Sequence, residues 1–157
     1  MNKKSLLIFA IVGFTLLLAA AAVYAASTIP DVIQMNDNYE HTKGIVEFSH
    51  AKHSTDYKAS CGDCHHDANH KPLTNLKEGD AVQKCIECHK KPGEVPSDVK
   101  KEWRNKKIKR AEQKKLELEY HAEALHENCK GCHRDYNKKN KTKAAPTTCT
   151  QCHPKVK

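Results

Sequence analysis

Apolar residues are concentrated at the start of this chain and are sparse in the rest of it. Lys3 and Lys4 precede an almost continuous apolar run over residues 6–22. Residues 23–25, Val-Tyr-Ala, then place small side chains at the positions that a signal peptidase recognises. The pattern predicts a secretory signal peptide over residues 1–25, cleaved at its end, and therefore a periplasmic protein.

An uncleaved membrane anchor is the alternative for the same segment. Residues 6–26 form a stretch of 21 residues, which is long enough to cross a bilayer. The small-residue site and the alanine-rich end of the run favour cleavage, and no cysteine near the cut offers a place for a lipid anchor. We expect contact with a membrane only if the segment is uncleaved.

One long helical pattern lies well beyond the predicted signal peptide. Ser97, directly after Pro96, is a good N-cap, and the residues beyond it are rich in Lys, Glu, Ala, Leu, Gln and Arg, which favour helix. We predict a single helix from Ser97 to about His126, which includes a basic insert at about residues 95–118. Its candidate apolar positions are Val99, Trp103, Ala111, Leu118, Ala122 and Leu125.

The remaining chain offers little material for a side-chain core. Of 157 residues, 38% are hydrophobic, 6% are aromatic and 29% are charged. We expect a short strand or hairpin within residues 26–43 and a solvated, lysine-rich loop over residues 137–148. Such a composition fits either disorder or a small domain, residues 26–157, that is held together by cofactors.

The cysteines favour the cofactors, because all eight fall into four copies of the motif C-x-x-C-H. This motif is typical of c-type haem attachment. The two thiols form thioethers with the porphyrin, and the histidine becomes the proximal iron ligand. The copies contain Cys61, Cys64 and His65; Cys85, Cys88 and His89; Cys129, Cys132 and His133; and Cys149, Cys152 and His153.

Disulfides and zinc sites are the alternative uses of such cysteine pairs. Neither use requires a histidine directly after the second cysteine, yet every copy has one. The sequence therefore predicts four covalently bound c-type haems, with thin protein wrapped around them.

The other histidines bear on the class of function. The chain has 11 histidines, and four of them belong to the motifs. Four of the remaining seven could supply the sixth ligand to every iron. An iron between two imidazoles has no open position for a substrate, which favours electron transfer over catalysis. The seven are His41, His50, His53, His66, His70, His121 and His126.

Several of these histidines form a pattern that resembles the class III cytochromes, the cytochrome c3 family. Residues 48–53 look like the F-x-H-x-x-H element that precedes the first haem motif in that family. A second histidine directly after His65, and His126 ahead of two closely spaced motifs, are similar as well. The resemblance covers about residues 44–93 and 119–154 and fails at the basic insert.

The resemblance implies a mainly α fold with much irregular loop, a small multihaem cytochrome fold whose haems form the core. It also implies four pairs of axial ligands. These are His50 with His65, His66 with His89, His53 with His133, and His126 with His153.

Not every histidine has one possible role. His121 is the rival of His126, since five residues on a helix correspond to a rotation of roughly 140°, so that both cannot face one iron. His41 and His70 are expected to be surface histidines, and either would become the candidate ligand of the second haem if His66 is not its ligand.

The function implied is electron transport in anaerobic respiration, without enzymatic activity. The expected partners are redox proteins: a hydrogenase, a dehydrogenase or a membrane cytochrome complex. A multihaem terminal reductase and a subunit of a conducting cytochrome filament are the alternatives. The formal net charge of +8 could suggest nucleic acid, but export and haem attachment argue against such a partner. The lysines fit a docking surface for acidic redox partners or a solvated face.

Overall fold

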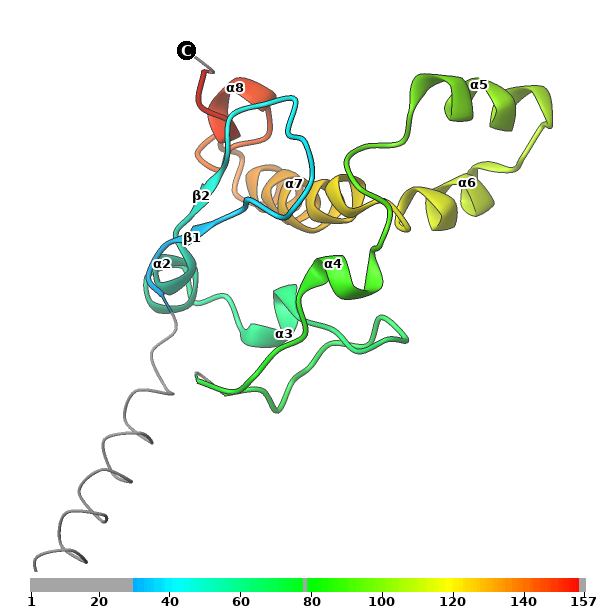
Figure 1. The fold of residues 1–157 in the computed structure, drawn as a ribbon. Helices are drawn as coiled ribbons and strands as arrows, with labels where there is room; N and C mark the ends of the chain where they lie inside the picture. The colour runs from blue at the N-terminus through cyan, green and yellow to red at the C-terminus, as the bar shows by residue number, and fades with distance from the viewer. Residues whose placement is uncertain (1–29, 78, 156–157) are drawn as a thin grey trace, which may run out of the picture.

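Short helices joined by irregular loops make up most of the fold (Figure 1). The computed structural model describes residues 30–77 and 79–155, so the predicted signal segment lies outside the described residues. The elements in chain order are β1 (Ile33–Gln34), β2 (Glu47–Phe48), α2 (His50–Thr55), α3 (Cys61–Cys64), α4 (Cys85–Cys88), α5 (Ser97–Asn105), α6 (Arg110–Glu117), α7 (His121–Lys139) and α8 (Cys149–Cys152).

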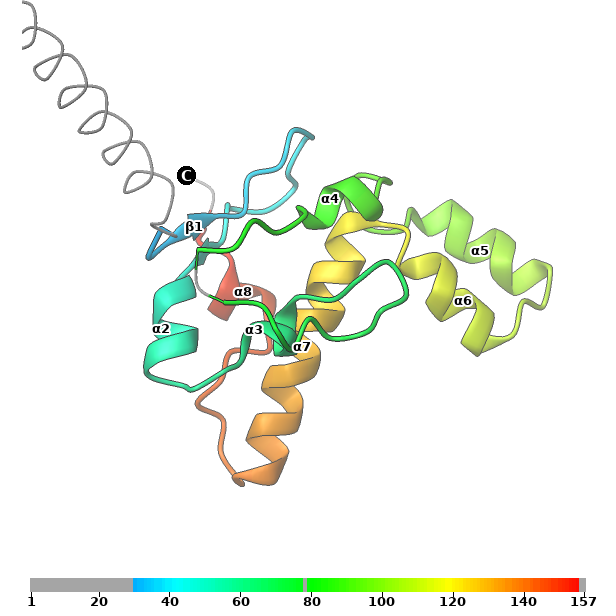
Figure 2. The same ribbon diagram turned by 90° about the horizontal axis from the view of Figure 1, so that it is seen from below.

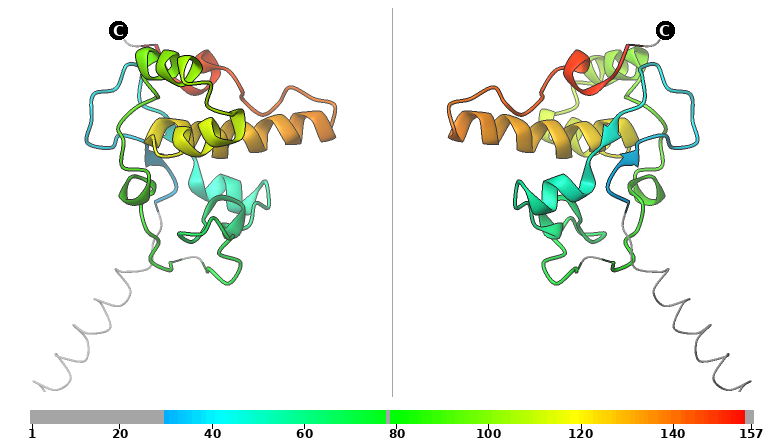
Figure 3. Two further views of the ribbon diagram at one scale, coloured as in Figure 1. Left: turned by 90° about the vertical axis from the view of Figure 1, so that its right-hand side faces the viewer. Right: turned by 90° about the vertical axis from the view of Figure 1, so that its left-hand side faces the viewer.

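Helix α7 is the central element. It lies between α8 on one side and α3 and α4 on the other, as Figures 1 and 3 show. Among the described residues, the buried hydrophobic side chains are Val95 and Trp103. None of the helices in residues 30–77 and 79–155 has the length and apolar character needed to cross a bilayer. The prediction of a mainly α fold with much loop and little side-chain core is confirmed.

The strand expected near the N-terminus is present as β1. It pairs with β2 in antiparallel fashion, with Ile33 opposite Phe48 and Gln34 opposite Glu47. Helix α2 begins two residues after β2 ends, and the Ala51 amide donates to the Asp31 carbonyl at 3.3 Å. This small sheet therefore fixes where α2 starts.

The prediction of one helix from Ser97 to about His126 is wrong. The segment forms α5, α6 and the first turns of α7, and α5 and α6 lie side by side at one end of the molecule (Figures 1 and 2). Lys107 has φ +51, outside the helical region, and the Ile108 amide donates to the Trp103 carbonyl at 3.0 Å. Helix propensity is similar along the whole segment, so it does not reveal this reversal, which buries Trp103.

A second break separates α6 from α7. Tyr120 is extended and forms a parallel bridge with Lys91. The His121 amide then donates to the Lys91 carbonyl at 2.8 Å, and the Ala122 amide donates to the Gly93 carbonyl at 3.0 Å. These bonds satisfy amides at the start of α7 that have no partner within the helix. They also hold α7 against the chain that follows α4.

His121 is the most deeply buried polar side chain described, with 1% of its surface exposed. Its Nδ1 lies 3.0 Å from the Tyr39 hydroxyl, and its Nε2 lies 3.3 Å from an Asp37 carboxylate oxygen. Burial lowers the pKa of His121, which keeps the ring neutral near pH 7 and lets Nδ1 accept the hydroxyl proton. His41 stacks on Tyr39 with ring centroids 4.6 Å apart. The cluster fastens the loop after β1 to the start of α7.

We expect Tyr39→Phe to lower the free energy of unfolding by about 1–3 kcal/mol, because it leaves a buried histidine nitrogen without its partner. Denaturant unfolding followed by circular dichroism measures this loss. Tyr136→Phe is the matched control, since Tyr136 is 52% exposed. Equal effects of the two substitutions would show that the Tyr39 hydroxyl does not stabilise the fold.

Candidate functional site

Each C-x-x-C-H copy contains a helical turn. In three copies the two cysteines bound a four-residue helix, namely α3, α4 or α8. In these copies the amide of the histidine donates to the carbonyl of the first cysteine at 2.8–2.9 Å. Because residues three and four apart share one face of a helix, both thiols and the imidazole are carried on the same side. This is the arrangement that thioether attachment and proximal ligation require.

Local sequence explains two of these turns. A capping box starts α3, in which the Ser60 amide donates to the Asp63 carboxylate at 2.8 Å. Thr148 and Gln151 form a second capping box at the start of α8. The spacing S-x-x-D and T-x-x-Q was a readable signal for these helix starts. The third copy differs, because its cysteines lie within the long helix α7.

The eight cysteines form no disulfide in the described structure. Burial raises the pKa of the Cys129 thiol to about 11 and raises the pKa of Cys64 and Cys85 as well. Within residues 30–77 and 79–155, no group of three or more His, Cys, Asp or Glu side chains is arranged to hold a metal ion.

The structure brings the histidines of all four predicted ligand pairs together. Two imidazoles that bind one metal at about 2 Å each have ring centroids roughly 6 Å apart. The residues thus fit a haem iron between each pair, although ligation itself stays a prediction. The centroid distances are 6.4 Å for His50 and His65, 6.0 Å for His66 and His89, 6.2 Å for His53 and His133, and 6.2 Å for His126 and His153.

Backbone carbonyls orient five of these eight rings. In each of the five, Nδ1 donates to a carbonyl, which leaves Nε2 unprotonated and available to a metal. Such bonds fix both the tautomer and the direction of the ring. The acceptors are Ser49 for His53, Asp67 for His66, Leu118 for His89, Pro146 for His133 and Gly44 for His153.

His126 and His121 have different surroundings. The His126 ring faces His153, whereas His121 contacts Tyr39 and Asp37. Burial lowers the pKa of His126, so its ring is neutral near pH 7 and can act as a ligand. Its Nδ1 lies 3.4 Å from a Glu94 carboxylate oxygen. The geometry favours His126 over its rival.

The alternative candidate His70 also lies close to His89. His70 was expected to be a surface residue, and it is exposed, but its ring centroid lies 6.4 Å from that of His89. His70 follows His66 by four residues in a turn, and that spacing was the available signal. His41, by contrast, stacks on Tyr39.

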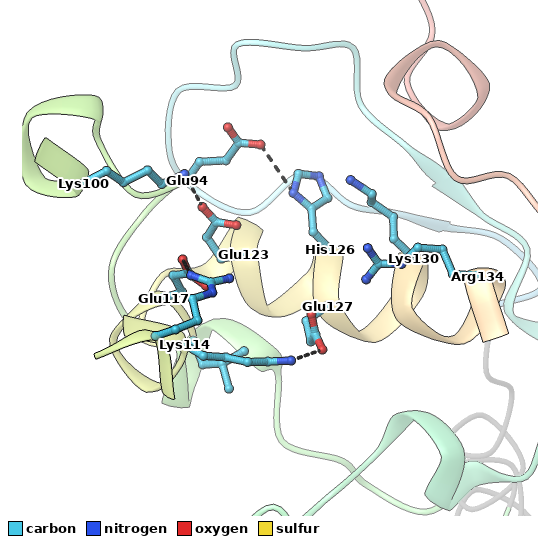
Figure 4. Close-up of a pocket in the computed structure, with 11 residues that line it drawn as sticks. Glu94, Lys100, Lys114, Glu117, Glu123, His126, Glu127, Lys130 and Arg134 are labelled. Atoms are coloured by element: carbon cyan, nitrogen blue, oxygen red, sulfur yellow. Dashed lines mark hydrogen bonds and ion pairs between the residues drawn. The ribbon is translucent and has the colours of Figure 1, made fainter. Parts of the chain in front are cut away.

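A charged pocket of about 340 Å³ lies between the basic insert and α7, and His126 forms part of its wall (Figure 4). Lys100 pairs with Glu123 at 3.0 Å, and Lys114 pairs with Glu127 at 2.6 Å. Lys130 and Arg134 follow His126 on the same face of α7. The insert therefore brings charge next to the predicted ligand of the fourth haem.

Haem-attachment motifs that each bring a histidine opposite a second histidine define a c-type cytochrome with more than one haem. The profile of the class III cytochrome C family matches residues 26–153, and the chain belongs to this family. Membership implies covalently bound c-type haem and multihaem electron transfer. No curated protein and no solved structure shows a significant match.

Gly44 allows the close approach that holds His153. A Cβ at this position would lie 2.3 Å from the Pro154 carbonyl oxygen, where the His153 Nδ1 also bonds to Gly44 at 2.8 Å. We expect Gly44→Ala to destabilise the protein by about 1–3 kcal/mol and to alter the haem attached at Cys149 and Cys152. Thermal unfolding and redox titration measure the two effects.

Lys43→Ala is the control, because Lys43 directly precedes Gly44 in the chain and is exposed. It should change the stability by no more than about 0.5 kcal/mol and leave the haem potentials unaltered. A Gly44→Ala protein as stable as Lys43→Ala would contradict the importance of the close approach.

Proposed function

We propose that this protein is a periplasmic electron carrier with four covalently bound haems, each held by two histidines. The proposal rests on the geometry of the four histidine pairs. Within each pair the two ring centroids lie 6.0–6.4 Å apart. When bound, each haem supplies a one-electron couple. The paired imidazoles leave no coordination position for a substrate, which supports a carrier over a terminal reductase.

Shared elements support rapid transfer between the haems. His65 and His66 are adjacent, with Cα atoms about 3.8 Å apart, and serve different haems in the predicted scheme. Helix α2 carries His50 and His53, and α7 carries His126 together with the third motif. In addition, the Asn128 amide group donates to the Cys64 carbonyl at 3.2 Å, which joins α7 to α3. Each connection keeps two haem sites close together.

The basic insert is the proposed docking surface for redox partners. Residues 97–118 contain nine Lys or Arg and four Asp or Glu residues. Such an excess of positive charge steers the approach of an acidic partner. The proposed partners are a hydrogenase, a dehydrogenase or a membrane cytochrome complex in anaerobic respiration. The predicted signal peptide supports the periplasmic location, and the family match begins at residue 26, directly after the proposed cleavage position.

Intact-mass measurement of the mature protein tests the cofactor content. We expect the mass of residues 26–157 plus four haems, which acidified acetone should not extract because thioether bonds hold them. Free thiols after complete maturation, with three haems or fewer, would contradict the proposed stoichiometry. Retention of residues 1–25 would instead favour the membrane anchor.

The ligation is tested by comparing two neighbouring histidines. His126→Ala should convert one iron from low-spin to high-spin and allow carbon monoxide to bind the reduced protein. His121→Ala should leave all irons low-spin while lowering stability by about 1–3 kcal/mol, because it removes a buried hydrogen-bonded ring. Electron paramagnetic resonance and visible absorption report the spin states. The opposite pattern would assign the ligand to His121, and a high-spin iron in the unaltered protein would favour a reductase.

A further inference from the structure

Two histidines lie on the distal side of the second haem motif. The ring centroid of His89, the proximal ligand of that motif, is 6.0 Å from His66 and 6.4 Å from His70. The rings of His66 and His70 are 5.0 Å apart. The three distances form a nearly equilateral triangle, so the directions from His89 to His66 and to His70 diverge by about 47°. An iron bound to His89 can therefore lie opposite only one of the two rings at a time. Each has the spacing that a metal between two imidazoles requires.

A closed turn fixes the two rings relative to each other. Asp67 organises this turn, because its side chain accepts hydrogen bonds from the Asn69 amide at 2.8 Å and the Lys71 amide at 2.9 Å. The Asp67 and Lys71 backbones also bond at 2.9 Å, and His66 forms an antiparallel bridge with Pro72. The proximity of the two histidines is therefore built into the backbone.

His70 occupies an unusual backbone position. Its φ is +59, in the left-handed region that favours glycine, and a non-glycine residue there costs of order 1–3 kcal/mol. The His70 amide donates to the Asp67 carbonyl at 3.0 Å, which helps to hold this conformation. The turn thus carries a side chain at a position where glycine would fit with less strain, and that side chain faces His66 and His89.

We propose that the haem attached at Cys85 and Cys88 has two interchangeable distal ligands, His66 and His70. This inference rests on the proposed bis-histidine carrier function. In the exchange, the iron–nitrogen bond to His66 breaks and one to His70 forms, with no change in the oxidation state of the iron. Either histidine would occupy the sixth coordination position of the iron, so the site would remain closed to substrates and oxygen.

The two ligands are not equivalent. His66 Nδ1 donates to the Asp67 carbonyl at 2.8 Å, which orients the ring and raises its basicity as a ligand. Its ring plane makes an angle of 77° with that of His89, whereas the His70 plane makes an angle of 41°. His66 is therefore the preferred ligand, and His70 replaces it in a different ring orientation.

The angle between the ring planes of His89 and its distal partner gives the exchange a spectroscopic signature. In low-spin ferric haem, the largest g value decreases as the two imidazole planes become more parallel. In His66→Ala holoprotein we expect all irons to stay low-spin, with a smaller largest g value for one haem. In the double variant His66→Ala, His70→Ala we expect about one quarter of the haem to become high-spin and to bind carbon monoxide when reduced.

The matched control is the double variant His66→Ala, His41→Ala, which removes a histidine that stacks on Tyr39 instead. It should behave like His66→Ala alone. Intact mass and circular dichroism verify four haems and the fold of each variant, in buffers without imidazole. A high-spin iron in His66→Ala, or a wholly low-spin double variant lacking His66 and His70, would overturn the inference. A high-spin iron in the unaltered protein would instead overturn the proposed carrier function.

Discussion

The pairing of two imidazoles across one iron is the constraint on which the proposed architecture depends. The described chain buries only two hydrophobic side chains, Val95 and Trp103, so packing alone supplies little cohesion. Each histidine pair instead connects segments that are distant in sequence. The pair His53 and His133, for example, joins α2 to α7 across 80 residues. Carbonyl groups then fix the ring directions, as Gly44 does for His153.

The basic insert contributes both side-chain packing and charge to the structure. It contributes Trp103 to the small apolar core, and α5 and α6 lie side by side at the end of the molecule near the start of α7. The insert also forms part of the charged pocket beside His126. This segment thus combines side-chain packing with a concentration of positive charge next to a predicted haem ligand.

The buried His121 illustrates why residue type alone does not assign a role. His121 and His126 have the same side chain and lie on the same helix, five residues apart. One is held by Tyr39 and Asp37, and the other faces His153. The difference comes from a loop more than 80 residues earlier in the chain, which no local pattern around α7 could indicate.

The sequence by itself determined the haem-attachment turns, because C-x-x-C-H places thiols and imidazole on one side of a helical turn through contacts within five residues. It also indicated the family and the mainly α fold with little core. Only the tertiary structure decided where the segment after Ser97 breaks, since similar helix propensity continues through Lys107 and the reversal depends on burying Trp103. It likewise placed His121 against Tyr39 and Asp37, and it brought His70 close to His89. These outcomes depend on contacts between distant segments, and such contacts leave no periodic signal in the sequence.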